Sequence, residues 1–149
     1  MAEYTYNAVQ VLQPQQAVVL NNSIPCTKGY VIHREDSGIF ILRGIVHNNN
    51  GYFARYQLTF NANVAIPTGG TAQSIALALT VNGEEIPTSK AIVTPVRANE
   101  YGNATVTAIV TVPRGCCLTV AIKNVAATDG ATEIPINVQN ANLVINRIA

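Results

Sequence analysis

The sequence predicts an all-β protein, an antiparallel β-sandwich of the jelly-roll type with about eight to ten strands. Two observations lead to this fold class. Apolar and polar residues alternate with a period of two along several segments, and turn-forming residues recur roughly every ten positions. No segment carries the apolar spacing of an amphipathic helix. A chain of 149 residues is long enough for one such domain with a substantial core.

The clearest signal is a hairpin predicted over residues 73–89. Every second residue of its first strand is large and apolar: Ile75, Leu77, Leu79 and Val81. Asn82-Gly83 follows, and these two residue types tolerate the positive φ angles of a type I′ turn. A two-residue loop places Val81 opposite Glu84 and Leu79 opposite Ile86. Pro87 has no backbone N–H, so the return strand is expected to end there.

Other segments also have strand character. They are residues 17–20, 29–34, 39–46, 52–63, 90–94, 103–112, 117–123 and 142–148. In residues 52–63 we expect Tyr56, Leu58, Phe60 and Ala62 to face the core and Arg55, Gln57, Thr59 and Asn61 to face outward. Residues 124–140 are expected to form a long loop with a short apolar piece. Residues 1–16 are predicted to be an N-terminal arm, and residues 17–149 the single jelly-roll domain.

Charge is scarce in this chain. Charged residues make up 11% of it, against about 25% in an average globular domain. Uncharged surface favours a subunit buried in an oligomer or lattice over a solitary monomer. The net charge is +1 without a basic block, which argues against nucleic-acid binding. No apolar run reaches the length of a membrane span, and the N-terminus lacks the features of a secretory signal.

Three cysteines leave two interpretations open. Because their number is odd, Cys26, Cys116 and Cys117 cannot all pair within one chain. They are either small buried apolar residues or partners in a disulfide, between chains or between Cys26 and one of the other two. The spacing of histidines and cysteines does not match a zinc site. We therefore expect no metal and no cofactor.

No catalytic motif is present, so we expect a protein that is not an enzyme. The candidate recognition loop contains Arg97, Glu100 and Tyr101, because loops on a rigid β scaffold often bind partners. Two other groups have simpler explanations. The charged run His33-Arg34-Glu35-Asp36 is typical of a solvated strand end. Glu84-Glu85 is typical of an exposed hairpin tip, although with Asn82 it offers oxygen ligands for calcium.

Four motifs occur in order: Ser37-Gly38 before a strand, Asn82-Gly83 with Ile86, Pro113-Arg114-Gly115, and the apolar tail Leu143–Ile148. With them, residues 29–149 resemble the jelly-roll superfamily of tumour necrosis factor and the complement-type globular heads. They are similar above all to its bacterial and phage branch, such as the C-terminal domain of exosporium collagen-like glycoproteins. The collagen stalk of those proteins has no counterpart here. The resemblance implies a homotrimer.

These observations predict a non-enzymatic structural protein. We expect a homotrimeric jelly roll that decorates a surface, as a phage capsid decoration or head-fibre protein on the virion. Its partners would be copies of itself, the major capsid or other lattice protein, and host glycans, with no nucleic acid and no membrane. Two alternatives remain open: a structural subunit of a spore- or cell-surface appendage, and a stand-alone carbohydrate-binding module.

Overall fold

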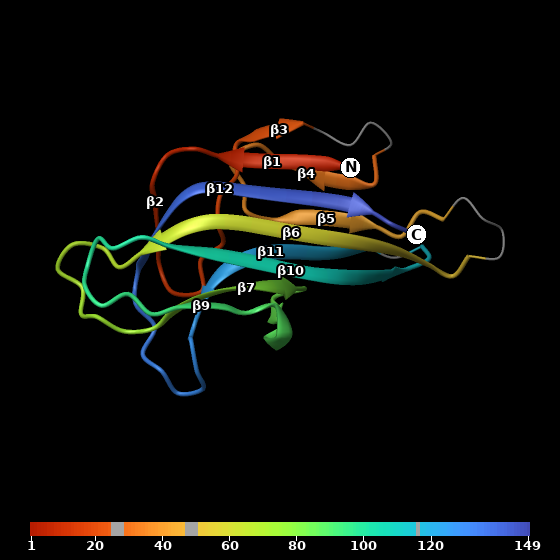
Figure 1. The fold of residues 1–149 in the computed structure, drawn as a ribbon. Helices are drawn as coiled ribbons and strands as arrows, with labels where there is room; N and C mark the ends of the chain where they lie inside the picture. The colour runs from red at the N-terminus through yellow and green to blue at the C-terminus, as the bar shows by residue number, and fades with distance from the viewer. Residues whose placement is uncertain (25–28, 47–50, 116) are drawn as a thin grey trace.

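The computed structural model describes residues 1–24, 29–46, 51–115 and 117–149. Two six-stranded antiparallel sheets pack face to face and enclose one main core (Figure 1). Both chain termini lie at the same end of the sandwich. The predicted all-β sandwich of the jelly-roll type is confirmed. The described residues form twelve strands, more than the eight to ten expected, because several strands are only two or three residues long.

The first sheet has the strand order β10-β6-β12-β1-β3, with β2 also paired to β12. Its strands are β1 (Ala2–Tyr6), β2 (Gln10–Leu12), β3 (Asn22–Ile24), β6 (Phe53–Ala65), β10 (Gly102–Pro113) and β12 (Ile136–Arg147). Three of these strands, β10, β6 and β12, have twelve or thirteen residues and lie side by side, with β10 at one edge of the sheet.

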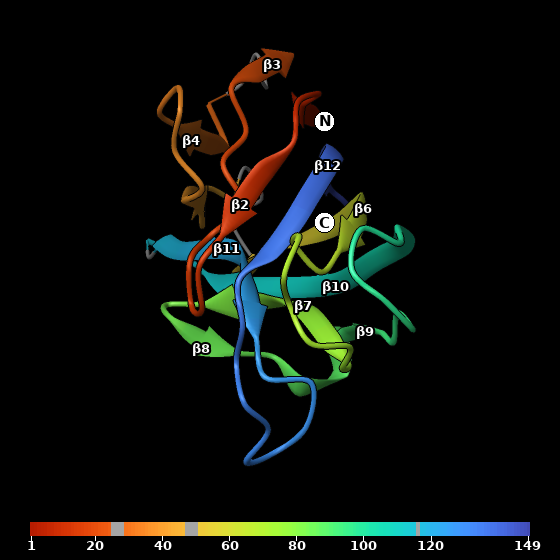
Figure 2. The same cartoon turned by 90° about the vertical axis from the view of Figure 1, so that its left-hand side faces the viewer.

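The second sheet has the order β4-β5-β11-β7-β8, with β9 also paired to β7. Its strands are β4 (Val31–His33), β5 (Phe40–Arg43), β7 (Ile75–Val81), β8 (Glu84–Glu85), β9 (Ala91–Val93) and β11 (Cys117–Val125). A single 3₁₀ turn, η1 (Pro87–Ser89), separates β8 from β9. The long loops after β6, β9 and β11 gather at the end of the sandwich that faces the viewer in Figure 2.

The β7–β8 hairpin forms as predicted. Asn82 and Gly83 have φ angles of 50° and 86°, as a type I′ turn requires. Val81 pairs with Glu84, and the N–H of Ile86 donates to the carbonyl of Leu79 at 2.9 Å. Pro87 then begins the 3₁₀ turn, where its lack of an N–H costs no sheet hydrogen bond.

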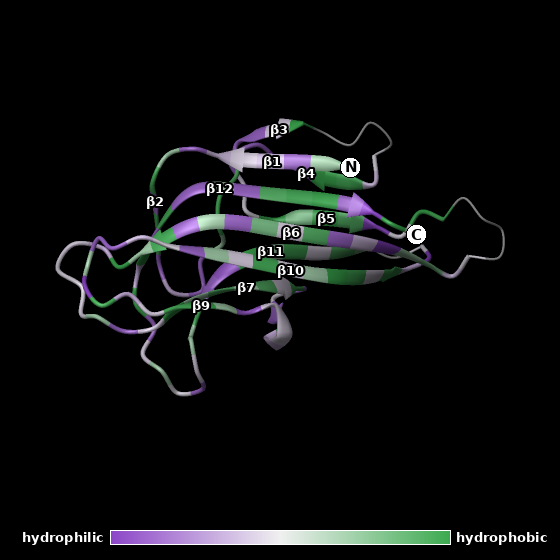
Figure 3. Ribbon diagram, viewed as in Figure 1, coloured by the Kyte–Doolittle hydropathy of each residue, from purple (hydrophilic) through white to green (hydrophobic). Residues whose placement is uncertain are grey.

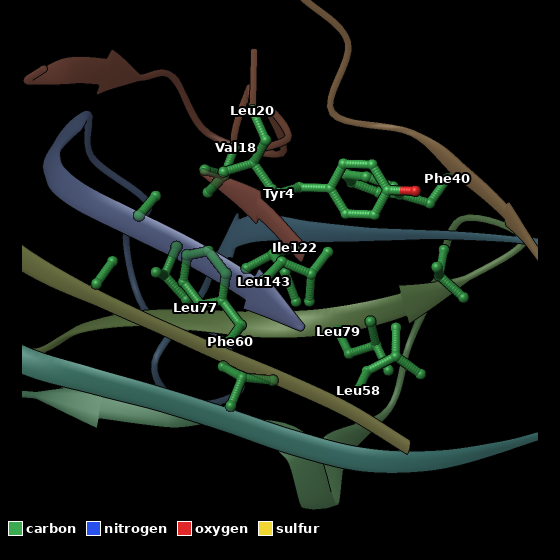
Figure 4. Packing of buried hydrophobic residues seen from close by; sticks show 14 of the residues in the cluster. Tyr4, Val18, Leu20, Phe40, Leu58, Phe60, Leu77, Leu79, Ile122 and Leu143 are labelled. Atoms are coloured by element: carbon green, nitrogen blue, oxygen red, sulfur yellow. The ribbon is translucent and has the colours of Figure 1, made fainter. Parts of the chain in front are cut away.

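The core consists of the inward residues of both sheets. Along β6 every second residue is buried, and the inward set predicted from the sequence is confirmed. The same alternation is visible as bands of contrasting hydropathy along β6 and β10 (Figure 3). In the close view, Phe60 and Leu143 of the first sheet face Leu77 and Ile122 of the second (Figure 4). Tight interdigitation of this kind accounts for most of the stability of a sandwich.

Residues 1–16, predicted to be an arm, lie in the sandwich instead. β1 pairs with β12 over five residues, and β2 pairs with the other half of the same strand. Tyr4 is only 2% exposed, and its ring packs against Phe40 with the centroids 4.7 Å apart. The apolar residues scattered through this segment are therefore core residues. Their partner strand lies at the other end of the sequence, where local patterns cannot reveal it.

Two further expectations were wrong in detail. Residues 17–20 make only isolated bridges at Ala17 and Leu20, while the strand β3 begins shortly after them, at Asn22. Residues 136–140 belong to β12 and not to a loop. A bulge between Gln139 and Asn142 shifts the register, with Asn140 at a φ of 54°. The bulge interrupts the alternation, so one long strand resembles two short segments in the sequence.

Candidate functional site

The outer face of the first sheet is the most unusual surface of the molecule. We define the neutral face as the outward residues of β6, β10 and β12 together. Their registers align them in rows across the sheet, such as Thr107–Thr59–Val144 and Thr105–Asn61–Asn142. The outward positions are mostly threonine, asparagine and glutamine: Gln57, Thr59, Asn61, Asn63, Asn103, Thr105, Thr107, Thr111, Asn137, Gln139, Asn142 and Asn146.

Charge is nearly absent from the neutral face. Arg55 is the only charged residue among the outward positions of these three strands, all of which the structure describes. Its guanidinium lies over the ring of Phe53, 4.7 Å from the centroid, at one margin of the face. Ordinary exposed sheet faces carry mixed charges, and edge strands are usually protected by them. β10 is an edge strand of twelve residues without a single charge.

Polar side chains on this face bond to one another. Asn103 Nδ2 donates to Asn61 Oδ1 at 2.6 Å, and Thr105 Oγ1 donates to Asn103 Oδ1 at 2.9 Å. At the margin of the face next to β1, Asn142 Nδ2 donates to Oε1 of Glu3, a β1 residue, at 2.6 Å. These bonds link β6 to β10 and β12 to β1. Because part of the hydrogen-bonding capacity is already used within the chain, less must be recovered when the face loses water.

Apolar side chains lie among these polar residues. Ile109 on β10 is 60% exposed and Phe53 is 41% exposed, while Val144 is partly buried. Isoleucine and phenylalanine at such exposure gain free energy when another surface covers them. The neutral face therefore combines apolar contact points with uncharged polar residues, and it shares the depletion of charged residues with the centre of protein–protein interfaces.

The sequence contained a signal for the neutral face. Residues 52–63 and 103–112 both place uncharged polar residues at alternate positions. The outward direction was predicted for residues 52–63, and no pairing between the two segments was predicted. Only the β6–β10 pairing joins the two rows into one surface.

The predicted recognition loop is a second candidate site. Arg97 Nε lies 3.5 Å from Glu100 Oε2, so these two residues form an ion pair. Tyr101 is 41% exposed beside them. Asn99 holds the loop in place, since its N–H donates to Ile66 O and its Nδ2 donates to Thr68 Oγ1, both at 2.9 Å. The structure thus brings the three predicted residues to one loop, where the ion pair neutralises the two charges.

His33 has a structural role. Its ring stacks on Phe40 with the centroids 4.3 Å apart, and Tyr4 packs edge-on against it at 4.8 Å. Nε2 lies 2.8 Å from the carbonyl oxygen of Ser37, to which it donates. Asp36, with a φ of 59°, completes the turn to β5. This charged run therefore closes a turn over the core, which fits the expectation of a strand end.

Glu84 and Glu85 do not converge. Glu85 Oε1 pairs with Lys90 Nζ at 2.9 Å, while Glu84 is exposed at the hairpin. Among the residues that the structure describes, no three His, Cys, Asp or Glu side chains are grouped closely enough to hold a metal ion. Asn82 Oδ1 accepts from the N–H of Thr119 at 3.0 Å, so it fastens the hairpin to β11.

The cysteines fall partly outside the described residues. Cys117 is exposed at the start of β11, opposite Arg43 of β5. Cys26 and Cys116 lie outside the described ranges, so the disulfide hypothesis stays a prediction. Within those ranges, no helix has both the length and the apolar character needed to cross a membrane.

No protein-family model and no curated protein matches this sequence. Among solved structures, the globular domain of a zebrafish complement 1qA protein superposes with a TM-score of 0.53 at 13% identity, covering 96% of this chain and 94% of that chain. The chain has the complement-head jelly-roll fold. The resemblance inferred from the four motifs is thereby confirmed for the fold. A sugar-binding protein, the EclA C-terminal domain, is similar at a TM-score of 0.42 and 15% identity, over 95% of this chain and 79% of that chain.

Proposed function

We propose that this chain is a non-enzymatic structural subunit whose neutral face associates with other copies, giving a homotrimer that decorates a larger surface. The neutral face carries the proposal: three long strands present many uncharged polar residues, a few apolar ones and a single charge. Low charge removes the repulsion that keeps identical molecules apart, and the exposed side chains of Ile109 and Phe53 add apolar contact points. A closed three-fold assembly would bury this face on every subunit and leave no unpaired interface to which further copies could add.

Attachment to a phage capsid is the form of this proposal that we favour. A trimer matches the three-fold and quasi-three-fold positions of a shell, where weak contacts from three subunits add by multivalency. The partner would be the major capsid or another lattice protein. Loops at the exposed end of the trimer would face the surroundings and host glycans. The resemblance to the phage branch of the superfamily supports this setting.

Light scattering tests the trimer directly. We expect a mass three times that of the 15.9 kDa chain at micromolar concentration. A stable monomer at that concentration would contradict the proposal.

Mass spectrometry of purified virions tests the setting. Peptides of this chain should co-purify with the capsid proteins, and their absence from virions would remove the capsid form of the proposal. A spore- or cell-surface appendage is the alternative, and it predicts high-mass species on non-reducing gels that collapse when the cysteines are reduced.

A further inference from the structure

A cleft of about 470 Å³ opens at the end of the sandwich where β5 ends and β10 turns into β11. Arg43 and the three residues after it form one side, and Arg114, Gly115 and Cys117 form the other. Among the described residues of this lining, arginine is the only charged type and none carries a carboxylate. The volume lies within the range of small-molecule sites. The cleft is therefore suited to a small anionic group.

Backbone contacts position the guanidinium of Arg43 and the turn that carries Arg114. Arg43 Nη1 donates to the carbonyl oxygen of Gly29 at 3.3 Å. A guanidinium has five N–H donors, so this bond leaves others for a ligand. Arg114 occupies the turn between β10 and β11, and its backbone N–H donates to Tyr52 O at 2.8 Å. This bond fixes the turn against the residue that precedes β6.

Two further arginines lie at the same end of the sandwich but outside the cleft. The guanidinium of Arg147 lies over the ring of Tyr30, 4.4 Å from the centroid, and Arg55 lies over Phe53. The cleft itself contains two positive charges, those of Arg43 and Arg114. Charges of one sign in a concave site raise the local concentration of ligands of the opposite sign.

An exposed aromatic residue adjoins the cleft. Tyr52 is 78% exposed although it is large and partly apolar, and its carbonyl is bonded to the Arg114 N–H. An aromatic ring offers a flat apolar surface that suits the C–H face of a pyranose ring. A guanidinium binds a carboxylate through two parallel hydrogen bonds. The two features together match a sugar that carries a carboxylate.

We propose that the Arg43–Arg114 cleft binds the carboxylate of an acidic sugar, a uronic acid unit of a polysaccharide, with Tyr52 as the platform for the ring. A concave site of this size accepts a single protruding sugar unit better than the flat surface of a protein. The cleft lies at the end of the second sheet and not on the neutral face, so the site does not depend on the trimer proposed above.

Binding can be measured by isothermal titration calorimetry with three probes of similar size. They are trigalacturonate, a neutral galactotriose, and a triglutamate peptide that carries similar carboxylates without sugar rings. We expect trigalacturonate to bind the full chain more tightly than the other two. The variants Arg43→Gln and Arg114→Gln should each weaken that binding about tenfold or more, because each loses a charge-assisted hydrogen bond.

Arg34→Gln is the matched control, since it removes the same charge from an exposed turn. It should leave the affinity unchanged. Arg114→Lys keeps the charge but loses the fork geometry, so its affinity should fall between those of the wild type and Arg114→Gln. Circular dichroism of every variant establishes that it is folded.

Three results would overturn the proposal. Equal binding of the neutral trisaccharide would mean that the arginines do not recognise the ligand. Equal or tighter binding of triglutamate would assign the cleft to an acidic protein segment. No binding of trigalacturonate by a folded protein would show that the cleft is not a site for uronic acids. Light scattering of the same samples tests the trimer separately, so the failure of one proposal does not imply failure of the other.

Discussion

The two sheets share one core, but their outer faces differ in chemistry. The neutral face of the first sheet consists mostly of uncharged polar residues, some of which bond to each other, and it forms a broad surface with little charge. In the second sheet, the outward residues of β7 are small, and Ala76 and Ala78 are buried at 2% and 0% exposure. Something within the chain must therefore cover them.

Val125 and Ala127 provide that cover, since they form a small buried cluster with the two alanines. Lys90 holds this segment in place. Its Nζ donates to Ala126 O and pairs with Glu85, both at 2.9 Å. Lys90 lies just before β9, and Ala126 lies just after β11, so the bond between them spans β7. The outer face of β7 is thus completed by its own chain, whereas the neutral face would be covered only in the proposed trimer.

Adding a charge to the neutral face should have the largest effect. Thr59 is exposed at the centre of the face, in the row with Thr107 and Val144. We expect Thr59→Lys to convert the trimer into a monomer, because three buried and unpaired ammonium groups would meet near the symmetry axis. Light scattering would show a threefold fall in mass.

The matched control adds the same charge to the other sheet. Ile32 on β4 is 45% exposed and faces outward from the second sheet. Ile32→Lys should leave the mass unchanged, since lysine is well tolerated on edge strands. If Ile32→Lys dissociates the oligomer and Thr59→Lys does not, the roles of the two faces are reversed.

Truncation of a buried core residue should cost a similar free energy of unfolding in either sheet. Leu79 of β7 and Leu58 of β6 are 1% and 2% exposed and face each other's sheet. Truncation of either residue to alanine should lower the free energy of unfolding by about 2–5 kcal/mol, through lost burial and the cavity left behind. Urea denaturation measures both. If only one of the two truncations lowers the free energy of unfolding by less than ~1 kcal/mol, the sheet that contains that residue contributes less to the core than the other sheet does.

Strand positions in the middle of the chain were the most predictable part of the fold. β6, β7 and β10 show clear alternation, and the Asn82-Gly83 turn follows from the φ preferences of two residues. These signals are local, so the sequence alone contains them. The places of Tyr4 and His33 were not predictable, because they depend on a three-ring cluster assembled from β1, β4 and β5.

Surfaces were less predictable than strands for the same reason. The recognition loop was identified from its residue types, but the ion pair between Arg97 and Glu100 depends on the loop conformation. The neutral face needs the pairing of β6 with β10, and the arginine cleft needs β5 beside the β10–β11 turn. The neutral face and the cleft join residues that are far apart in the sequence, such as Thr59 with Thr107 and Arg43 with Arg114. The local sequence pattern does not reveal such contacts.

Enlarging an outward residue of β7 tests the cover over that strand. Ala78→Leu should lower the free energy of unfolding by about 1–3 kcal/mol, because the added methyl groups meet the buried residues Val125 and Ala127. In the Lys90→Ala background the same change should cost less, since the bond to Ala126 that holds this segment in place is gone. A double-mutant cycle in urea measures this coupling. Zero coupling between the two positions would show that Lys90 does not hold the cover in place.

The turn at the end of β7 should give the smallest effect. Gly83 has a φ of 86°, and a Cβ built on it meets no atom within 4 Å. Gly83→Ala therefore adds backbone strain without a steric clash, and thermal unfolding should show a loss of about 1 kcal/mol. The oligomer should persist, because the hairpin belongs to the second sheet and lies away from the neutral face. If this small change also dissociated the trimer, the contacts between subunits would have to include the β7–β8 hairpin, and the separation between the two faces would fail.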